Sequence, residues 1–99
     1  MKMLILVFRS TLNEQVLRVL DELKLPGYTE STEVYGTGSM GRAFDSHAWP
    51  GYNSMVLSAV GEGDARKVAG ALKELSERLT AQGEKVPLRL FAVPCEQLL

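Results

Sequence analysis

The run from Met3 to Phe8, MLILVF, is apolar at every position. A strand with one face in water would alternate apolar and polar residues, so a strand of this kind needs cover on both faces. A signal peptide would need a longer apolar run and a small-residue cleavage site after it. We therefore expect a central strand of a sheet here rather than a targeting segment.

A helix is predicted directly after this strand. Thr11 and Glu14 have the spacing of a capping box, and Ser10 offers a second cap oxygen. The pattern predicts a helix from about Leu12 to Lys24, which the segment Leu25–Gly27 ends because proline lacks an amide hydrogen and glycine tolerates the turn. Its apolar residues recur at helical spacing: Val16, Leu17, Val19, Leu20 and Leu23.

The second half of the chain repeats this order. The segment Ser54–Val60 is again apolar on both faces and predicts another central strand. Asp64 can cap a helix that runs to about Ala81, and Gly83 is suited to end it. A last strand is predicted from Val86 to Val93, with a proline near its start and another just beyond it, as suits a strand at a sheet edge.

Between the halves, Tyr28–Tyr35 is rich in residues that favour strands. The resulting order predicts one α+β domain over residues 1–99: a ferredoxin-like βαββαβ sandwich with a four-stranded antiparallel sheet and two helices on one face. The uncovered face would expose a large apolar patch on a single copy. We therefore expect subunits to bury it, and sheet-packing proteins of this architecture most often form homotrimers.

A long loop, Gly36–Pro50, joins the two halves. Its glycines at 36, 38 and 41 free the backbone, and Asp45, His47 and Trp49 gather near its end. A strand that runs out into a glycine-rich loop and returns is a common place for binding. By itself a Gly-x-Gly pattern usually marks only a turn, so the glycines leave ligand contact open.

The segment Gly27–Arg42, GYTESTEVYGTGSMGR, resembles the nitrogen-regulatory PII signalling proteins. The matching motif is Gly-x-Thr-x-x-x-Glu-Val followed by Gly-x-Gly, and the order of elements extends the resemblance to nearly the whole chain. The sequence His-Ala-Trp-Pro, residues 47–50, is similar to a divergent PII-like group. The family positions that this chain shares are Gly27, Thr29, Glu33, Val34, Gly36 and Gly38.

The resemblance implies a trimer with three clefts between subunits, each for an adenine nucleotide, and a T-loop (here Gly36–Pro50) that touches a target protein such as a membrane transporter or an enzyme. We therefore expect a cytoplasmic regulatory protein, and because the sequence contains no catalytic arrangement of residues we do not expect an enzyme. The implied ligand residues are Thr29, Gly36, Thr37, Gly38, Ser39, Lys85 and Arg89. The T-loop residues expected to meet a partner are Arg42, Phe44, His47 and Trp49.

Two departures from the PII pattern narrow the expected ligand. Met40 stands where PII proteins carry a glutamine that holds the nucleotide-bound metal, and a thioether has no affinity for magnesium. This argues against 2-oxoglutarate sensing. The phosphate-binding loop corresponds to Gln82–Pro87, which has one glycine, one lysine and an added carboxylate. A small anionic ligand, such as a nucleotide with fewer phosphates, is therefore expected at Lys85 and Arg89.

Other interpretations of the loop remain open. Asp45 and His47 would share one face on extended backbone, and imidazole with carboxylate suits zinc or copper, as in a CutA-like trimeric metal-binding protein. In the simpler alternative no metal is bound, and His47 and Trp49 only fold the loop back onto the body of the domain. Trp49 suits either a stacking platform or a partner contact. A third alternative is an interaction module without a ligand.

Several classes of function are disfavoured. A formal net charge of -1 gives no excess of positive charge for nucleic acid, although Arg9 and Arg42 could meet a small anion. Asp45, Ser46 and His47 are sequence neighbours and cannot adopt the geometry of a catalytic triad. The lone Cys95 cannot form an internal disulfide, which fits a reducing cytoplasm.

Overall fold

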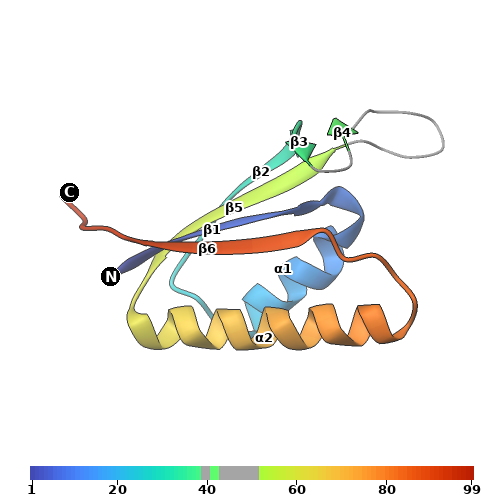
Figure 1. Cartoon of the computed structure of the whole chain (residues 1–99). Helices are drawn as coiled ribbons and strands as arrows, with labels where there is room; N and C mark the ends of the chain where they lie inside the picture. Colours follow the sequence, from blue (N-terminus) through green and yellow to red (C-terminus); the bar gives the residue numbers. More distant parts are fainter. Residues whose placement is uncertain (39–40, 43–51) are drawn as a thin grey trace.

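A computed structural model gives the arrangement of the chain and describes residues 1–38, 41–42 and 52–99, with only the backbone of residues 37, 38, 41 and 42 considered (Figure 1). A four-stranded antiparallel sheet in the order β2-β5-β1-β6 carries two helices on one face. This confirms the ferredoxin-like βαββαβ architecture. The elements are β1 (Lys2–Arg9), a 3-10 turn η1 (Ser10–Leu12), α1 (Asn13–Glu22), β2 (Thr29–Val34), β3 (Thr37–Gly38), β4 (Gly41–Arg42), β5 (Asn53–Val60), α2 (Glu62–Ala81) and β6 (Leu88–Pro94).

The two strands that the sequence predicts to be central lie inside the sheet. β1 pairs with β5 on one side and β6 on the other, and β5 lies between β1 and β2. The β6 strand is at an edge, as its prolines indicated, but its bounds differ from the prediction. It begins at Leu88, after Pro87, rather than at Val86, and Pro94 is its last paired residue, opposite Lys2, rather than a residue beyond it. An edge position tolerates proline because a missing amide hydrogen on the open side costs no ladder bond.

The core lies between the sheet and the helices. Alternate residues of β1 (Leu4, Leu6 and Phe8) are buried against the helices, together with Val16 and Leu20 of α1. Four residues of α2 complete the packing on the same side: Val68, Leu72, Leu75 and Leu79. The intervening residues of each strand point to the opposite side of the sheet, which we call the outer face.

The N-terminal caps differ from the prediction. Ser10 and Thr11 lie inside the 3-10 turn, α1 begins only at Asn13, and no side chain caps either element. The capping box with Glu14 is therefore wrong. The reason is that the chain turns tightly straight out of β1: the 3-10 turn occupies the place of the expected first helical turn, and the Asn13 N–H donates to the Ser10 carbonyl.

The second helix begins earlier and ends as expected. Its first residue is Glu62, so Asp64 lies in the first turn and not at the cap. In the first turn its negative charge still interacts favourably with the positive end of the helix dipole. At the other end, Gly83 has a φ of 82° and its N–H donates to the Thr80 carbonyl, while the Glu84 N–H reaches back to Leu79. This is the Schellman pattern, and it confirms Gly83 as the helix stop.

Candidate ligand site

Two paired stems hold the base of the T-loop. Val34 at the end of β2 pairs with Asn53 at the start of β5, and the short β3–β4 hairpin continues beyond the sheet (Figure 1). The rings of Tyr35 and Tyr52 lie 5.6 Å apart between centroids and join the two stems. A Cβ on Gly36 would stand 3.1 Å from the Asn53 side-chain nitrogen, so glycine allows the close approach at this point.

A β-bulge sets the direction in which the loop leaves. The β2–β5 register shifts between Ser31 and Val34, and Glu33 has a φ of 60°. A left-handed residue that is not glycine is uncommon, and a bulge bends its strand. The bulge therefore turns the end of β2 just before Gly36. No sequence pattern indicated it, because nothing in TESTEV favours a positive φ.

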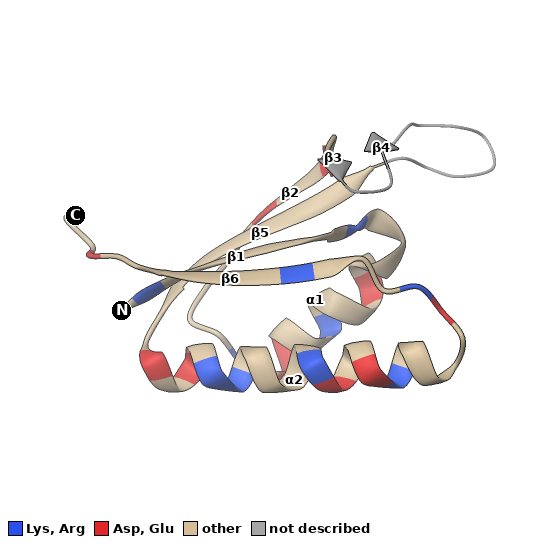
Figure 2. Cartoon of the chain, viewed as in Figure 1, with Lys and Arg blue, Asp and Glu red and all other residues tan. Residues whose placement is uncertain are grey.

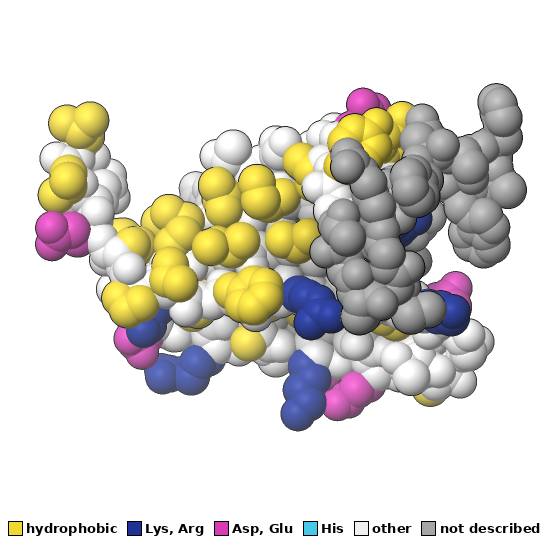
Figure 3. All heavy atoms as spheres, turned by 45° about the horizontal axis from the view of Figure 1, so that its top comes forward, with side chains coloured by type: hydrophobic (Ala, Val, Ile, Leu, Met, Phe, Trp, Pro, Cys, Tyr) yellow, Lys and Arg dark blue, Asp and Glu magenta, His cyan; other side chains and the backbone are white. Residues whose placement is uncertain are grey.

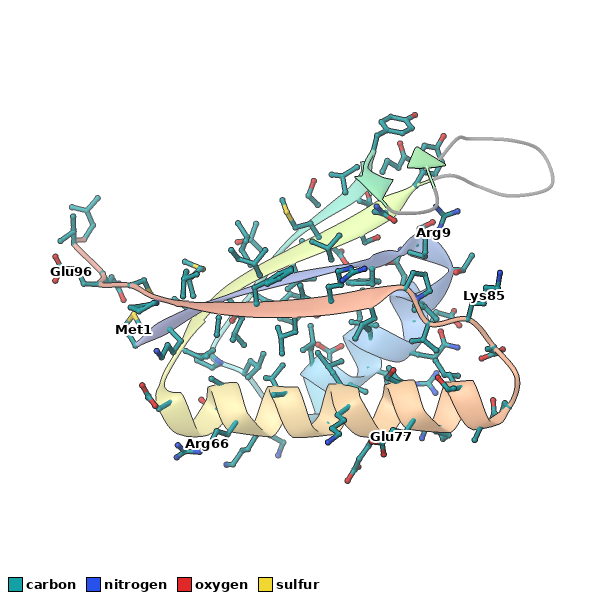
Figure 4. All side chains as sticks on the ribbon, in the orientation of Figure 1. Met1, Arg9, Arg66, Glu77, Lys85 and Glu96 are labelled. Carbon is teal, nitrogen blue, oxygen red and sulfur yellow. The ribbon has the colours of Figure 1, made fainter. Side chains whose placement is uncertain are left out.

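Basic residues gather at the same end of the sheet. The Arg9 N–H donates to the Pro87 carbonyl at 3.2 Å, and Val7 pairs with Arg89. Figure 4 shows Arg9 and Lys85 at this end, close to where the T-loop leaves the sheet. Arg89 and Lys85 are exposed, and Arg9 is half-buried. This end of the domain is suited to an anion.

The predicted ligand residues fall on the two opposite edges of the sheet. Thr29 is exposed at the start of β2 and pairs with Leu57 of β5, whereas Arg89 belongs to β6 and Lys85 precedes it. β5 and β1 lie between these two edges. Three strand spacings separate β2 from β6 by about 14 Å. A single chain therefore does not bring all of these residues together.

The remaining predicted site residues are not tested by the structure. Ser39, Phe44, Asp45, His47 and Trp49 lie outside the described residues. Thr37, Gly38 and Arg42 have a described backbone in β3 and β4 but no described side chain. Among the described residues no three His, Cys, Asp or Glu side chains are grouped to hold a metal, and the Asp45–His47 alternative stays a prediction.

Two serines on the helix side of β5 anchor the scaffold, and the sequence analysis missed their role. The Ser54 hydroxyl donates to Asn13 Oδ1 at 2.7 Å, and the Ser58 hydroxyl donates to the Gly27 carbonyl at 2.6 Å. Both serines are buried. Their spacing of four within an apolar strand was the available signal, because it puts both hydroxyls on the buried face.

Tyr28 provides a further anchor between α1 and β2. Its hydroxyl donates to Asp21 Oδ1 at 2.8 Å. This hydrogen bond, aided by partial burial and by the negative charges of Asp21 and Glu30, raises the pKa of Tyr28 above its ordinary value. The bond fixes the turn that leads from α1 to the β2 edge of the sheet.

The chain belongs to the family described as Nitrogen regulatory protein P-II, whose model matches residues 1–98. The family consists of regulators and not of enzymes, as the resemblance implied. None of the curated proteins matches the sequence closely enough to count as a relative. Among the described residues, no helix has the length and apolar character required to cross a membrane.

Similar solved structures include CPII, a nitrogen regulatory PII-like protein of Thiomonas intermedia K12. Its complex with ADP and bicarbonate has a TM-score of 0.65 and 17% identity, over 93% of this chain and 84% of that one. Its complex with ADP, AMP and bicarbonate has a TM-score of 0.64 and 16% identity, over 99% of this chain and 94% of that one. A putative PII-like signalling protein of Thermus thermophilus has a TM-score of 0.59 and 20% identity, over 93% of this chain and 83% of that one. These similarities show a shared fold.

Proposed function

We propose that this protein is a trimeric regulator that binds an adenine nucleotide between neighbouring subunits and acts on a target protein through the T-loop. The observation that carries the proposal is that the predicted ligand residues lie on the two opposite edges of the sheet. Family membership and the nucleotides bound to CPII support the class of ligand. We place this activity in the cytoplasm, with a transporter or an enzyme as the target.

The outer face supplies the surface for a trimer. Phe91 is 53% exposed, Val93 42% and Leu57 36%. Figure 3 shows the hydrophobic side chains forming one broad area that ends near Lys or Arg side chains. Monomeric proteins rarely keep such an area in water, because burying it is favourable. The other apolar residues of this face are Met3, Ile5, Val7, Met55 and Ala59.

The symmetry of a ring of three then completes the site. If three outer faces turn toward a common axis, each sheet forms one wall of a three-sided prism. Every corner of that prism joins two different edges, because a cyclic contact is heterologous. Thr29 and the loop base of one subunit would thus meet Lys85 and Arg89 of the next. One nucleotide per corner gives a stoichiometry of one per subunit.

The charge of the loop after α2 favours a nucleotide with one or two phosphates. This loop begins at the carbonyl end of the helix, where the dipole is negative. Glu84 stands beside Lys85, and both are exposed. Each added phosphate brings more negative charge to this surface, so we expect AMP and ADP to bind more tightly than ATP.

Titration calorimetry tests this proposal after the mass of the protein in solution has been measured. We expect saturable binding of AMP and ADP at one per subunit, with bicarbonate included in a parallel series. Replacing Arg89 with alanine should weaken AMP binding about 10- to 100-fold, the value of a hydrogen bond to a charged group. Arg66→Ala is the matched control, since Figure 4 shows Arg66 at the opposite end of α2 from Lys85.

Two results would contradict the proposal. If the Arg89→Ala variant binds AMP with wild-type affinity, Arg89 is not part of the site. If the wild-type protein binds none of the nucleotides, adenine nucleotides are not its ligands. Zinc and copper are titrated in the same way for the metal-binding alternative. Metal affinity that is unaffected by His47→Ala would leave that alternative without its histidine ligand.

A further inference from the structure

The bulge in β2 adds one residue to the strand that leads into the T-loop. Ser31 pairs with Met55, and the next pair is Val34 with Asn53. Between these pairs β2 has two residues and β5 has one, which is the arrangement of a β-bulge. Glu33 is the second of the two β2 residues, and its φ of 60° lies in the left-handed region.

An extra residue reverses the faces of the residues that follow it. Side chains of a strand alternate between its two faces, so a shift by one position turns the following residues to the opposite face. Before the bulge, Thr29 lies on the outer face with its partner Leu57. Thr29 and Gly36 are seven positions apart, and an odd separation would put them on opposite faces of a regular strand.

The structure instead places Gly36 on the outer face. Asn53 pairs with Arg9, which follows the buried Phe8, so Asn53 lies on the outer face, and its partner Val34 lies there with it. A Cβ on Gly36 would stand 3.1 Å from the Asn53 side-chain nitrogen, so Gly36 faces the same way. Because glycine has no side chain, the backbone at this point stays open to a ligand.

The two tyrosines support the same assignment independently. Tyr35 follows Val34 and Tyr52 precedes Asn53, so continued alternation puts both rings on the helix side. Their centroids are 5.6 Å apart with an angle of 56° between the ring planes, so the two rings do share a side. Without the extra residue Tyr35 would face outward, and this contact would not form.

The bulge therefore brings together residues that were predicted to bind one ligand. Thr29 and Gly36 of β2 and the loop base share the outer face with Arg89, which pairs with Val7 on that face. The proposed function needs these residues on one face, because the outer faces of neighbouring subunits meet at the nucleotide.

We propose that Glu33 is a positioning residue for the nucleotide: its left-handed backbone maintains the bulge that turns Gly36 to the outer face. This rests on the proposed function. Figure 2 shows the acidic residues of β2, Glu30 and Glu33, and both are exposed. Glu33 acts through its backbone conformation and not through its charge.

Three substitutions separate the backbone of Glu33 from its charge. Isoleucine is β-branched and strongly disfavours a positive φ, so Glu33→Ile favours the regular register that turns Gly36 to the helix side. Its AMP affinity should fall about 10-fold, because only molecules with the bulge bind. Glu33→Gln removes the charge alone and should bind AMP as the wild type does. Glu33→Gly adopts a positive φ readily and should bind at least as tightly.

Deletion of Glu33 is the decisive variant. In the shortened strand Thr32 would stand opposite Ser54 and Val34 would remain opposite Asn53, so the pairing becomes regular while Gly36 keeps the outer face. We therefore expect the deletion variant to bind AMP more tightly than Glu33→Ile. A purely structural role of residue 33 predicts the reverse order, because losing a residue disturbs a strand more than exchanging a side chain.

Glu30→Ile is the matched control. It places the same side chain at an exposed position in the regular part of β2, and Glu30 faces the helix side with its buried partner Val56. Its AMP affinity should not change. Titration calorimetry with AMP gives the affinities, and urea unfolding and sedimentation show that each variant is folded and has the wild-type mass. Glu33→Val replaces Glu33→Ile if the latter does not fold.

The possible results separate this inference from the proposed function. Wild-type AMP affinity in Glu33→Ile, or weaker binding by the deletion variant than by Glu33→Ile, would overturn the positioning role. A loss of affinity in Glu33→Gln would also overturn it, because the charge would then be the cause. A wild-type protein that binds no AMP would instead refute the proposed function, and Glu33 would have no nucleotide to position.

Discussion

Replacing Phe91 with aspartate should dissociate the proposed trimer, a ring of three subunits, and leave the subunit folded. Phe91 is 53% exposed on the outer face and is not part of the buried core. A phenylalanine side chain buries about 150 to 250 Å², so about 100 Å² of Phe91 remains available to a neighbour. At about 25 cal/mol per Å², this area contributes about 2.5 kcal/mol per copy.

Three copies lose about 7 kcal/mol together, which corresponds to roughly five powers of ten in the association constant of the ring. Light scattering coupled to size-exclusion chromatography would show this as a change from the mass of three chains to the mass of one. The control is Leu98→Asp, because Leu98 is 82% exposed but lies in the C-terminal tail beyond β6. An unchanged mass for Phe91→Asp, or an equal loss for Leu98→Asp, would refute burial of the outer face.

Three further predictions concern the scaffold. Gly83→Ala should cost about 1 kcal/mol of unfolding free energy in urea, because alanine is strained at a φ of 82°, whereas Gly70→Ala inside α2 should add about as much. If both substitutions changed the free energy of unfolding in the same direction, this prediction would be wrong. Ser54→Ala should cost about 1 to 3 kcal/mol, since it leaves Asn13 Oδ1 without its hydroxyl donor. A double variant with Asn13→Ala that is strictly additive would argue against that bond. The raised pKa of Tyr28 adds stability that is complete below pH of about 10 and is lost as the pH rises through the folded value. Tyr28→Phe should therefore flatten the alkaline fall of the melting temperature, and an unchanged slope would contradict the bond.

The fold could be predicted because its signals are local. A short apolar run such as Met3–Phe8 favours a strand that is covered on both faces, and Gly83 follows a helical pattern at the place where the end of the helix needs a left-handed residue. The first residues of the two helices were harder to predict from the sequence. The backbone of Ser10 is held by Tyr52, which is 42 positions away in the chain, and no local pattern reveals that contact.

The candidate site was predictable residue by residue but not as an arrangement. Thr29 and Arg89 could each be named from the family pattern. Their separation on opposite edges depends on the strand order, which places β5 and β1 between them. The bulge at Glu33 was equally hidden, because it arises from a register shift against β5 rather than from a residue that prefers the left-handed region.

The closure at the base of the T-loop has an evolutionary consequence. The Val34–Asn53 pair, the contact between the two tyrosine rings and the Tyr52–Ser10 bond complete the scaffold before the loop departs. Inserted residues beyond this point add only loop entropy, about 0.6 kcal/mol for each doubling of length. Descendants of such a chain could exchange one loop for another and acquire new contact surfaces while inheriting the same scaffold.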